Sequence, residues 1–176
     1  MAQLTSPASV SEALRNMLWK KLVHPDEVVR AILADKSQIT LCSPHALSNA
    51  DRSRSNYLSV FLFRVQEREA FRQMNRSADA GRDLRLAVDL HYLVAPLTNS
   101  VHNDQLVFGR VLKLFHEIPV LEDSGTDLSG PLRPVDEPIR ILRLSLSIPD
   151  QCALWRALAV PLHLAACYSV GPVFLS

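Results

Sequence analysis

The sequence predicts a single α+β domain, of the broad α/β class, in which helices pack on a mostly antiparallel or mixed sheet of about four to five strands. Three stretches carry this prediction. Residues 84–94 alternate between apolar and other side chains, residues 57–65 are almost continuously apolar, and residues 101–117 repeat with a helical period. With 176 residues, of which 48% are hydrophobic and 21% charged, the chain suits one domain spanning 1–176.

The alternation in residues 84–94 places every second side chain, from Leu84 to Val94, on one face of a strand. Pro96 lacks a backbone donor, so we expect the strand to end near it. Residues 57–65 have the composition of a strand buried on both faces, which predicts a central position in the sheet.

The helical period of residues 101–117 gathers large apolar residues within one arc of about 160°: Val107, Phe108, Val111, Leu112, Leu114, Phe115 and Ile118. Arg110 and Lys113 lie on the opposite side, spaced so that Glu117 can pair with both. Leu106 also falls on the polar side. It is either an isolated exposed leucine, which is the commoner case, or a contact with another chain.

The remaining elements follow from shorter signals. Ser9 and Glu12 have the spacing of a capping box after a loose leader at residues 1–8, and Ser147 and Asp150 repeat that spacing. The other expected elements are helices over 9–23, 26–34 and 147–159, strands over 38–42, 139–146 and 162–170, a surface loop over 43–56, and an apolar C-terminal tail over 171–176.

Two polar stretches, residues 66–83 and 122–138, are expected to be surface loops. The first is either a solvated loop or a projecting arm that binds a partner through its apolar and arginine side chains. The candidate interface residues on these loops, the helix and the tail are Arg68, Phe71, Arg72, Met74, Arg76, Arg82, Leu106, Arg133 and Phe174.

Composition excludes several classes of protein. The chain carries 19 Lys and Arg against 18 Asp and Glu, which argues against a nucleic-acid partner. No apolar run is long enough for a membrane span, and no basic region precedes an apolar run at the N-terminus, so we expect cytoplasmic synthesis without a signal peptide. The three widely spaced cysteines predict neither disulfides nor a metal site.

A search for catalytic patterns gives one weak candidate. The sequence contains no GxSxG, P-loop, GxGxxG or HExxH motif, and its six histidines do not have metal-ligand spacing. Asp89 and His91 share the polar face of the 84–94 strand and have the residue types of a base and its orienting group. A nucleophile such as Ser100 or Cys42 would have to reach them through the tertiary fold. We therefore expect no enzyme, cofactor or metal, with a small cytosolic enzyme using Asp89 and His91 as the remote alternative.

Four stretches nevertheless resemble the cap, or tail-terminator, proteins of extracellular contractile injection systems, the phage-tail-like particles typified by the antifeeding prophage. They are VSEAL at 10–14, NYLSVFLFRVQE at 56–67, LAVDLHYLVAP at 86–96 and LVFGRVLKLFHEIPVL at 106–121. The third and fourth are the most specific. The closing LSL at 144–146, LWRAL at 154–158 and YSV at 168–170 are also similar to the family.

The resemblance implies a structural protein without catalysis, a homohexameric ring that ends the growth of the inner tube and sheath. Its expected partners are itself, the inner tube protein and the sheath protein, in an assembled particle that is either retained in the cell or released by lysis. The loops over 66–83 and 122–138 are the expected ring and tube contacts, and an exposed C-terminal edge strand is expected to pair with the sheath. Some family members extend beyond the last strand, whereas this sequence stops at Ser176, which leaves open whether an extension attaches to the sheath. The alternative is a tail-completion or adaptor protein of the same kind of particle.

Overall fold

The computed structural model describes residues 6–48, 55–69, 86–121 and 138–175. Its helical elements are α1 (Pro7–Leu18), the π-helical turn η1 (Trp19–Val23), α2 (Glu27–Ile32), the 3₁₀ turn η2 (Lys36–Gln38), α3 (Pro44–Ser48), α5 (Val101–Glu117) and α6 (Ile148–Ala157). The strands are β1 (Ile39–Thr40), β2 (Tyr57–Glu67), β3 (Leu86–Leu97), β4 (Arg140–Leu144) and β5 (Ala166–Leu175).

These strands form one five-stranded sheet in the order β1-β2-β3-β5-β4. The β1–β2 pair is parallel and the other three pairs are antiparallel. The sheet is therefore mixed, which confirms the predicted α+β class and the predicted number of strands.

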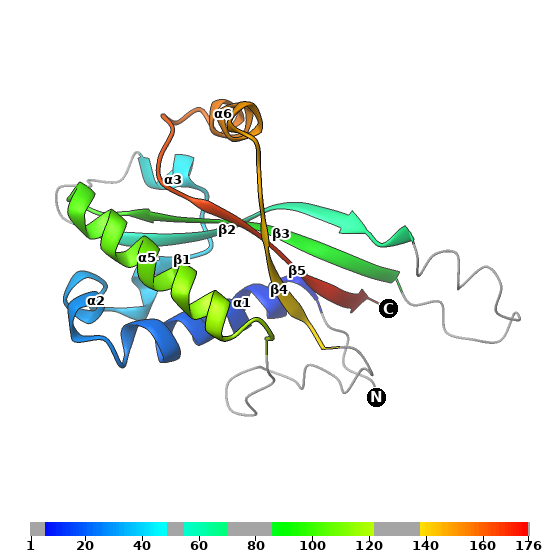
Figure 1. The fold of residues 1–176 in the computed structure, drawn as a ribbon, viewed down its shortest axis with the longest axis horizontal. Helices are drawn as coiled ribbons and strands as arrows, with labels where there is room; N and C mark the ends of the chain where they lie inside the picture. Colours follow the sequence, from blue (N-terminus) through cyan, green and yellow to red (C-terminus); the bar gives the residue numbers. More distant parts are fainter. Residues whose placement is uncertain (1–5, 49–54, 70–85, 122–137, 176) are drawn as a thin grey trace, which may run out of the picture.

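Helices lie on both faces of this sheet (Figure 1), with α1, α2 and α5 on one face and α3 and α6 on the other. The larger core lies under α1 and α5, where Leu14, Val107 and Tyr92 are almost completely buried. The Phe115 ring on α5 meets the Tyr168 ring on β5 edge-on at 4.6 Å between centroids, a favourable aromatic geometry. A smaller core under α6 contains Trp155 and Leu93. Burial on both faces thus fixes β3 and β5 in the middle of the molecule.

The central elements begin and end close to the predicted residues. The α5 helix spans the predicted 101–117, with Ser100 accepting at its N-terminus from the Asn103 N–H. Ser147 likewise accepts from the Asp150 N–H at the start of α6, as the sequence predicted. Strand β3 ends at Leu97, one residue after Pro96, which agrees with the expected end near this proline.

Several boundaries were predicted wrongly. Helix α1 begins at Pro7, inside the expected leader, because Ser6 and Ser9 form the capping box rather than Ser9 and Glu12. The expected loop over 43–56 contains α3. Residues Gln66 and Glu67, assigned to a loop, continue β2.

The largest correction concerns the C-terminus. The residues expected to form a tail, 171–176, continue the last strand to Leu175 through the cis peptide at Gly171–Pro172. This strand lies between β3 and β4 and is not an edge. A signal for this was present, since residues 166–175 carry no charged side chain, as expected of a strand covered on both faces.

Candidate functional site

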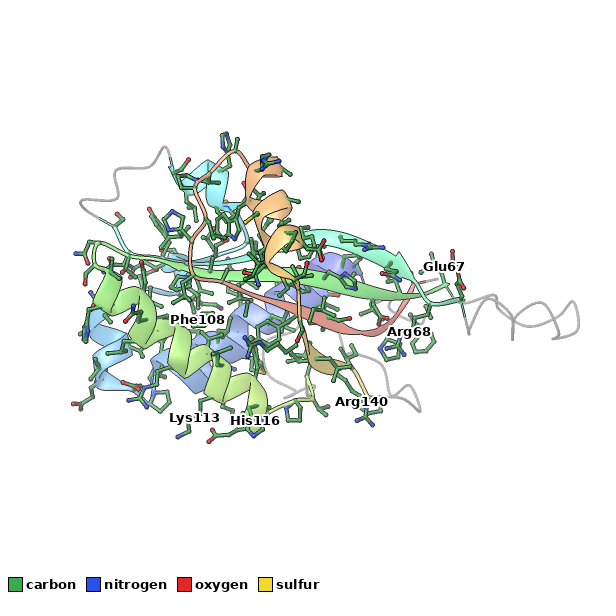
Figure 2. All side chains as sticks on the ribbon, turned by 45° about the horizontal axis from the view of Figure 1, so that its top comes forward. Glu67, Arg68, Phe108, Lys113, His116 and Arg140 are labelled. Atoms are coloured by element: carbon green, nitrogen blue, oxygen red, sulfur yellow. The ribbon has the colours of Figure 1, made fainter. Side chains whose placement is uncertain are left out.

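One end of the sheet projects beyond the helices, where β2 ends and β3 begins (Figures 1 and 2). Gln66 pairs with Asp89 and Glu67 with Val88 in the ladder there. Residues 64–67 are exposed, and Figure 2 shows Glu67 and Arg68 at this end of the sheet. The predicted arm over 66–83 starts at this point. Its candidate residues Phe71, Arg72, Met74, Arg76 and Arg82, like Arg133 in the second loop, lie outside the described residues.

Arg68 is bonded to β3 at the base of the projection. Its Nε donates to both carboxylate oxygens of Asp89 at 2.8 Å, and its backbone N–H donates to the Ala87 carbonyl at 2.9 Å. The two side chains are 29% and 19% exposed, so water screens this pair less than an ion pair on an open surface. Arg68 thus fixes the direction in which the chain leaves β2.

Asp89 also faces the backbone of β5. The β3–β5 ladder shifts register between Val88 and Leu90, so Asp89 lies opposite Gly171 and Pro172. A Cβ on Gly171 would overlap Oδ1 of Asp89 and lie 3.1 Å from the Val88 carbonyl oxygen. A larger residue here would have to displace the carboxylate that binds Arg68, because this carboxylate occupies the space of a side chain.

The structure does not assemble the catalytic pair that the sequence offered. Among the described residues, no hydrogen bond joins Asp89 to His91, and Asp89 accepts from Arg68 instead. Burial, and then the charge of Arg64, lowers the pKa of His91, while the Asp89 charge opposes that change. His91 contacts the Phe63 ring at 6.2 Å between centroids. The His91 imidazole therefore packs beside an apolar neighbour.

Two candidate interface residues differ in position from the prediction. Leu106 does not lie on the polar side of α5 but packs, partly buried, against the main core, so it belongs to the buried face of the helix. Phe174 lies within β5, paired with Ala87, and not in a free tail. On the outer side of α5, Lys113 meets Glu117 at 3.6 Å, while Arg110 pairs with Asp26 of the α2 cap at 3.0 Å instead of with Glu117.

Strand β4 is an edge strand of the sheet, next to β5. The sequence analysis did not predict this edge position. Strand β4 pairs with β5 from Arg140 to Leu144, and Val120 forms a single bridge to Arg140 on its outer side. Arg140, Leu142 and Arg143 are exposed. Alternating apolar and basic residues in so short a strand are typical of a sheet edge, and this was the available signal.

A small cavity of about 150 Å³ lies where β4 ends, between α6 and the start of β5. Leu93, Leu144, Trp155 and Cys167 contribute to its lining. Burial raises the pKa of the Cys167 thiol to about 11. A second, wider hollow of about 370 Å³ between η1, α2 and α5 has mixed charge and is crossed by the Arg110–Asp26 ion pair.

Within the described ranges, no three His, Cys, Asp or Glu side chains gather in a way that would hold a metal ion. Within the same ranges, the helices are too short or too polar to span a bilayer.

The sequence matches the family described as the Pvc16 N-terminal domain over residues 9–176. The chain belongs to this family. This confirms the family resemblance seen in the four sequence stretches. No curated protein sequence matches the chain.

Two solved structures share the fold. The first is the sheath/tube terminator of an extracellular contractile injection system, PVC, in its extended state, with a TM-score of 0.63 and 19% sequence identity. The second is the tube-terminating cap of the anti-feeding prophage, with a TM-score of 0.60 and 17% identity. Each match covers 99% of this chain but only 58% and 57%, respectively, of the solved chains. The family domain described here thus corresponds to little more than half of either relative.

Proposed function

We propose that this chain is a structural cap of a contractile injection particle, which forms a ring on the last layer of the inner tube and sheath and stops their growth. The observation that carries the proposal is the family match over residues 9–176, together with the likeness of the whole fold to two terminators of such particles. The partners are further copies of the chain, the tube protein and the sheath protein. The reaction class is assembly, with no catalytic step.

The architecture supports this role, because a terminator must keep its shape while it binds on several sides. Two cores hold helices on both faces of one sheet. From this rigid block, β2 and β3 carry the chain outward at one end, and the Arg68–Asp89 pair orients the exit. A head-to-tail ring needs two different surfaces on each subunit, and the projection at one end of the sheet is our candidate for one of them.

The arm residues then have a defined task. We propose that Phe71, Arg72, Met74, Arg76 and Arg82 contact a neighbouring subunit or the tube, and that Arg133 contributes to the second loop surface. Arg68 differs from them because it is already paired with Asp89. Its contribution is to direct the arm, so its loss would affect assembly indirectly.

The test is particle length and ring formation. Deletion of the gene is expected to give tubes and sheaths of uncontrolled length in electron micrographs, and the wild-type gene restores a narrow length distribution. The triple change Arg72→Gln, Arg76→Gln and Arg82→Gln is expected to lower incorporation into particles while the thermal unfolding of the isolated chain stays unchanged.

A matched control uses two arginines on other surfaces. Arg30 lies on α2 and Arg156 on α6, both exposed, and changing both to Gln removes positive charge without touching the arm. Normal length control in the triple variant would count against the arm as a contact. Normal length control after gene deletion would refute the terminator role itself.

A further inference from the structure

The outer side of β4 is covered over only part of its length. The Leu121 N–H donates to the Ile139 carbonyl at 2.8 Å, and the Ile141 N–H donates to the Pro119 carbonyl at 2.7 Å. Backbone groups of alternate strand residues point to the same side, and the β4–β5 register has no shift. The N–H and C=O of Arg143 therefore point away from β5, as those of Ile141 do.

These groups have no partner within the described ranges 6–48, 55–69, 86–121 and 138–175: no backbone or side-chain hydrogen bond to them occurs there. The side chains nearby are exposed as well, with Leu142 at 52%. An extended segment laid along this edge beyond the Pro119–Ile141 pair would find both backbone groups of Arg143 ready to bond. This is the arrangement that strand addition uses.

Charge indicates what kind of strand fits. Arg140 and Arg143 both lie on this edge, and no acidic residue occurs between Pro138 and Pro149. Figure 2 shows Arg140 at the outer start of β4, pointing away from the body. Two basic strands repel when they pair directly, so the edge disfavours its own copy. A segment carrying carboxylates is attracted to it.

The cavity beside the end of β4 adds an anchor point. Side chains of an added strand alternate between the two faces, so one opposite Leu144 would lie on the same face as the 150 Å³ cavity under α6. A cavity of this volume is large enough for a group about the size of benzene. Arg143, Ser145 and Gln151 also line the cavity, so the surface combines a polar edge with room for one side chain that can bond to polar groups.

We propose that the outer edge of β4 is a strand-acceptor site for an extended, acidic segment of another protein of the particle, which bonds to the backbone at residues 143–145 and places one side chain in the cavity. The partner's identity as a particle protein rests on the proposed cap function. The backbone donors, the basic side chains and the cavity are features of this chain alone.

Arg143→Pro separates this site from the fold. Proline at position 143 removes the N–H that faces outward and leaves the β4–β5 hydrogen bonds intact. Edge strands tolerate proline at such positions. Arg143→Ala keeps the N–H and removes only the charge. Arg156→Ala, on the outside of α6, is the control for loss of an exposed arginine elsewhere.

The experiment adds the purified full-length chain to tube–sheath particles assembled without it, and measures the bound fraction over a range of chain concentrations. Arg143→Pro is expected to weaken binding about tenfold or more, Arg143→Ala severalfold, and Arg156→Ala not at all. Hydrogen exchange of the wild-type chain should show the Arg143 amide slowed on binding, and this measurement decides the question if the proline variant does not fold.

Two failures can be told apart. If the wild-type chain binds particle ends but the Arg143 amide exchanges as fast as in the free chain, and Arg143→Pro binds equally well, the strand-acceptor site is refuted while the cap function stands. If the wild-type chain binds no ends, the cap function is refuted, and this partner with it. Self-association of the chain that Arg143→Pro abolishes would identify a second copy as the occupant and overturn the acidic partner.

Discussion

Replacing Gly171 with alanine tests the contact at the base of the projection most directly. The new Cβ would overlap Oδ1 of Asp89, so either the two strands separate or the carboxylate turns away from Arg68. Turning away breaks the two 2.8 Å bonds to Nε. A hydrogen bond to a charged group contributes about 1.5 to 3 kcal/mol when buried, and this pair is partly exposed, which favours the low end.

With the cost of overpacking added, the expected loss in the free energy of unfolding is about 2 to 3 kcal/mol. For a domain of this size, that lowers Tm by roughly 4 to 12 °C. Thermal and urea denaturation followed by circular dichroism measure both quantities. Gly109→Ala is the matched control: nothing lies within 4 Å of its Cβ position on α5, so alanine should stabilise the helix by about 0.5 to 1 kcal/mol.

A double-mutant cycle identifies the cause. In an Asp89→Ala background the overlapping oxygen is gone, so Gly171→Ala should cost at least about 1 kcal/mol less than in the wild type. Additive effects of the two changes, or a Gly171→Ala variant as stable as the wild type, would refute the claim that the carboxylate occupies the space above this glycine.

Three further predictions concern single groups. Burial raises the pKa of Tyr92 to about 12, although the hydrogen bond to Ser11 acts in the opposite direction. Folding therefore favours the neutral phenol, and about 2 to 3 kcal/mol of stability that is present below pH 10 should be lost between pH 10 and 12. Urea denaturation at several pH values should show a smaller loss for Tyr92→Phe. Ala159 has φ 55° after α6, so Ala159→Gly should raise the free energy of unfolding by about 1 kcal/mol in the same assay, and an unchanged value would argue against strain there. A thiol reagent at pH 8 should label exposed Cys42 quickly and buried Cys167 only after unfolding; equal rates would contradict the placement of Cys167 in the second core.

Sequence periodicity correctly predicted the elements in which one face is strongly apolar and buried while the other face is polar and exposed. The α5 helix is the clearest case, because its apolar arc faces the sheet and Pro119 follows it directly. The failures came from competing local signals. Ser6 and Ser9 took the cap that Ser9 and Glu12 also offered, and the Gly171–Pro172 break in the pattern concealed a continuous strand.

The candidate site was less predictable, because it depends on the order of strands in the sheet. Asp89 was correctly placed on the polar side of its strand, but its partner, Arg68, lies 21 residues away, and no local pattern links the two. Leu106 illustrates the converse problem. A helical wheel puts it among polar residues, whereas in the fold it packs, partly buried, against the main core. Strand order alone made β4 the edge and β5 the interior strand.

The pairing of Leu86 with Leu175 has a practical effect on how this protein is handled. The point where the polypeptide departs from β2, the point where it returns to β3 and the finish of β5 all sit together at one extremity of the sheet (Figure 1). An affinity tag or fluorescent fusion attached directly after β5 would start beside this shared exit, so we expect it to hinder contacts made there and to produce an assembly defect that belongs to the label.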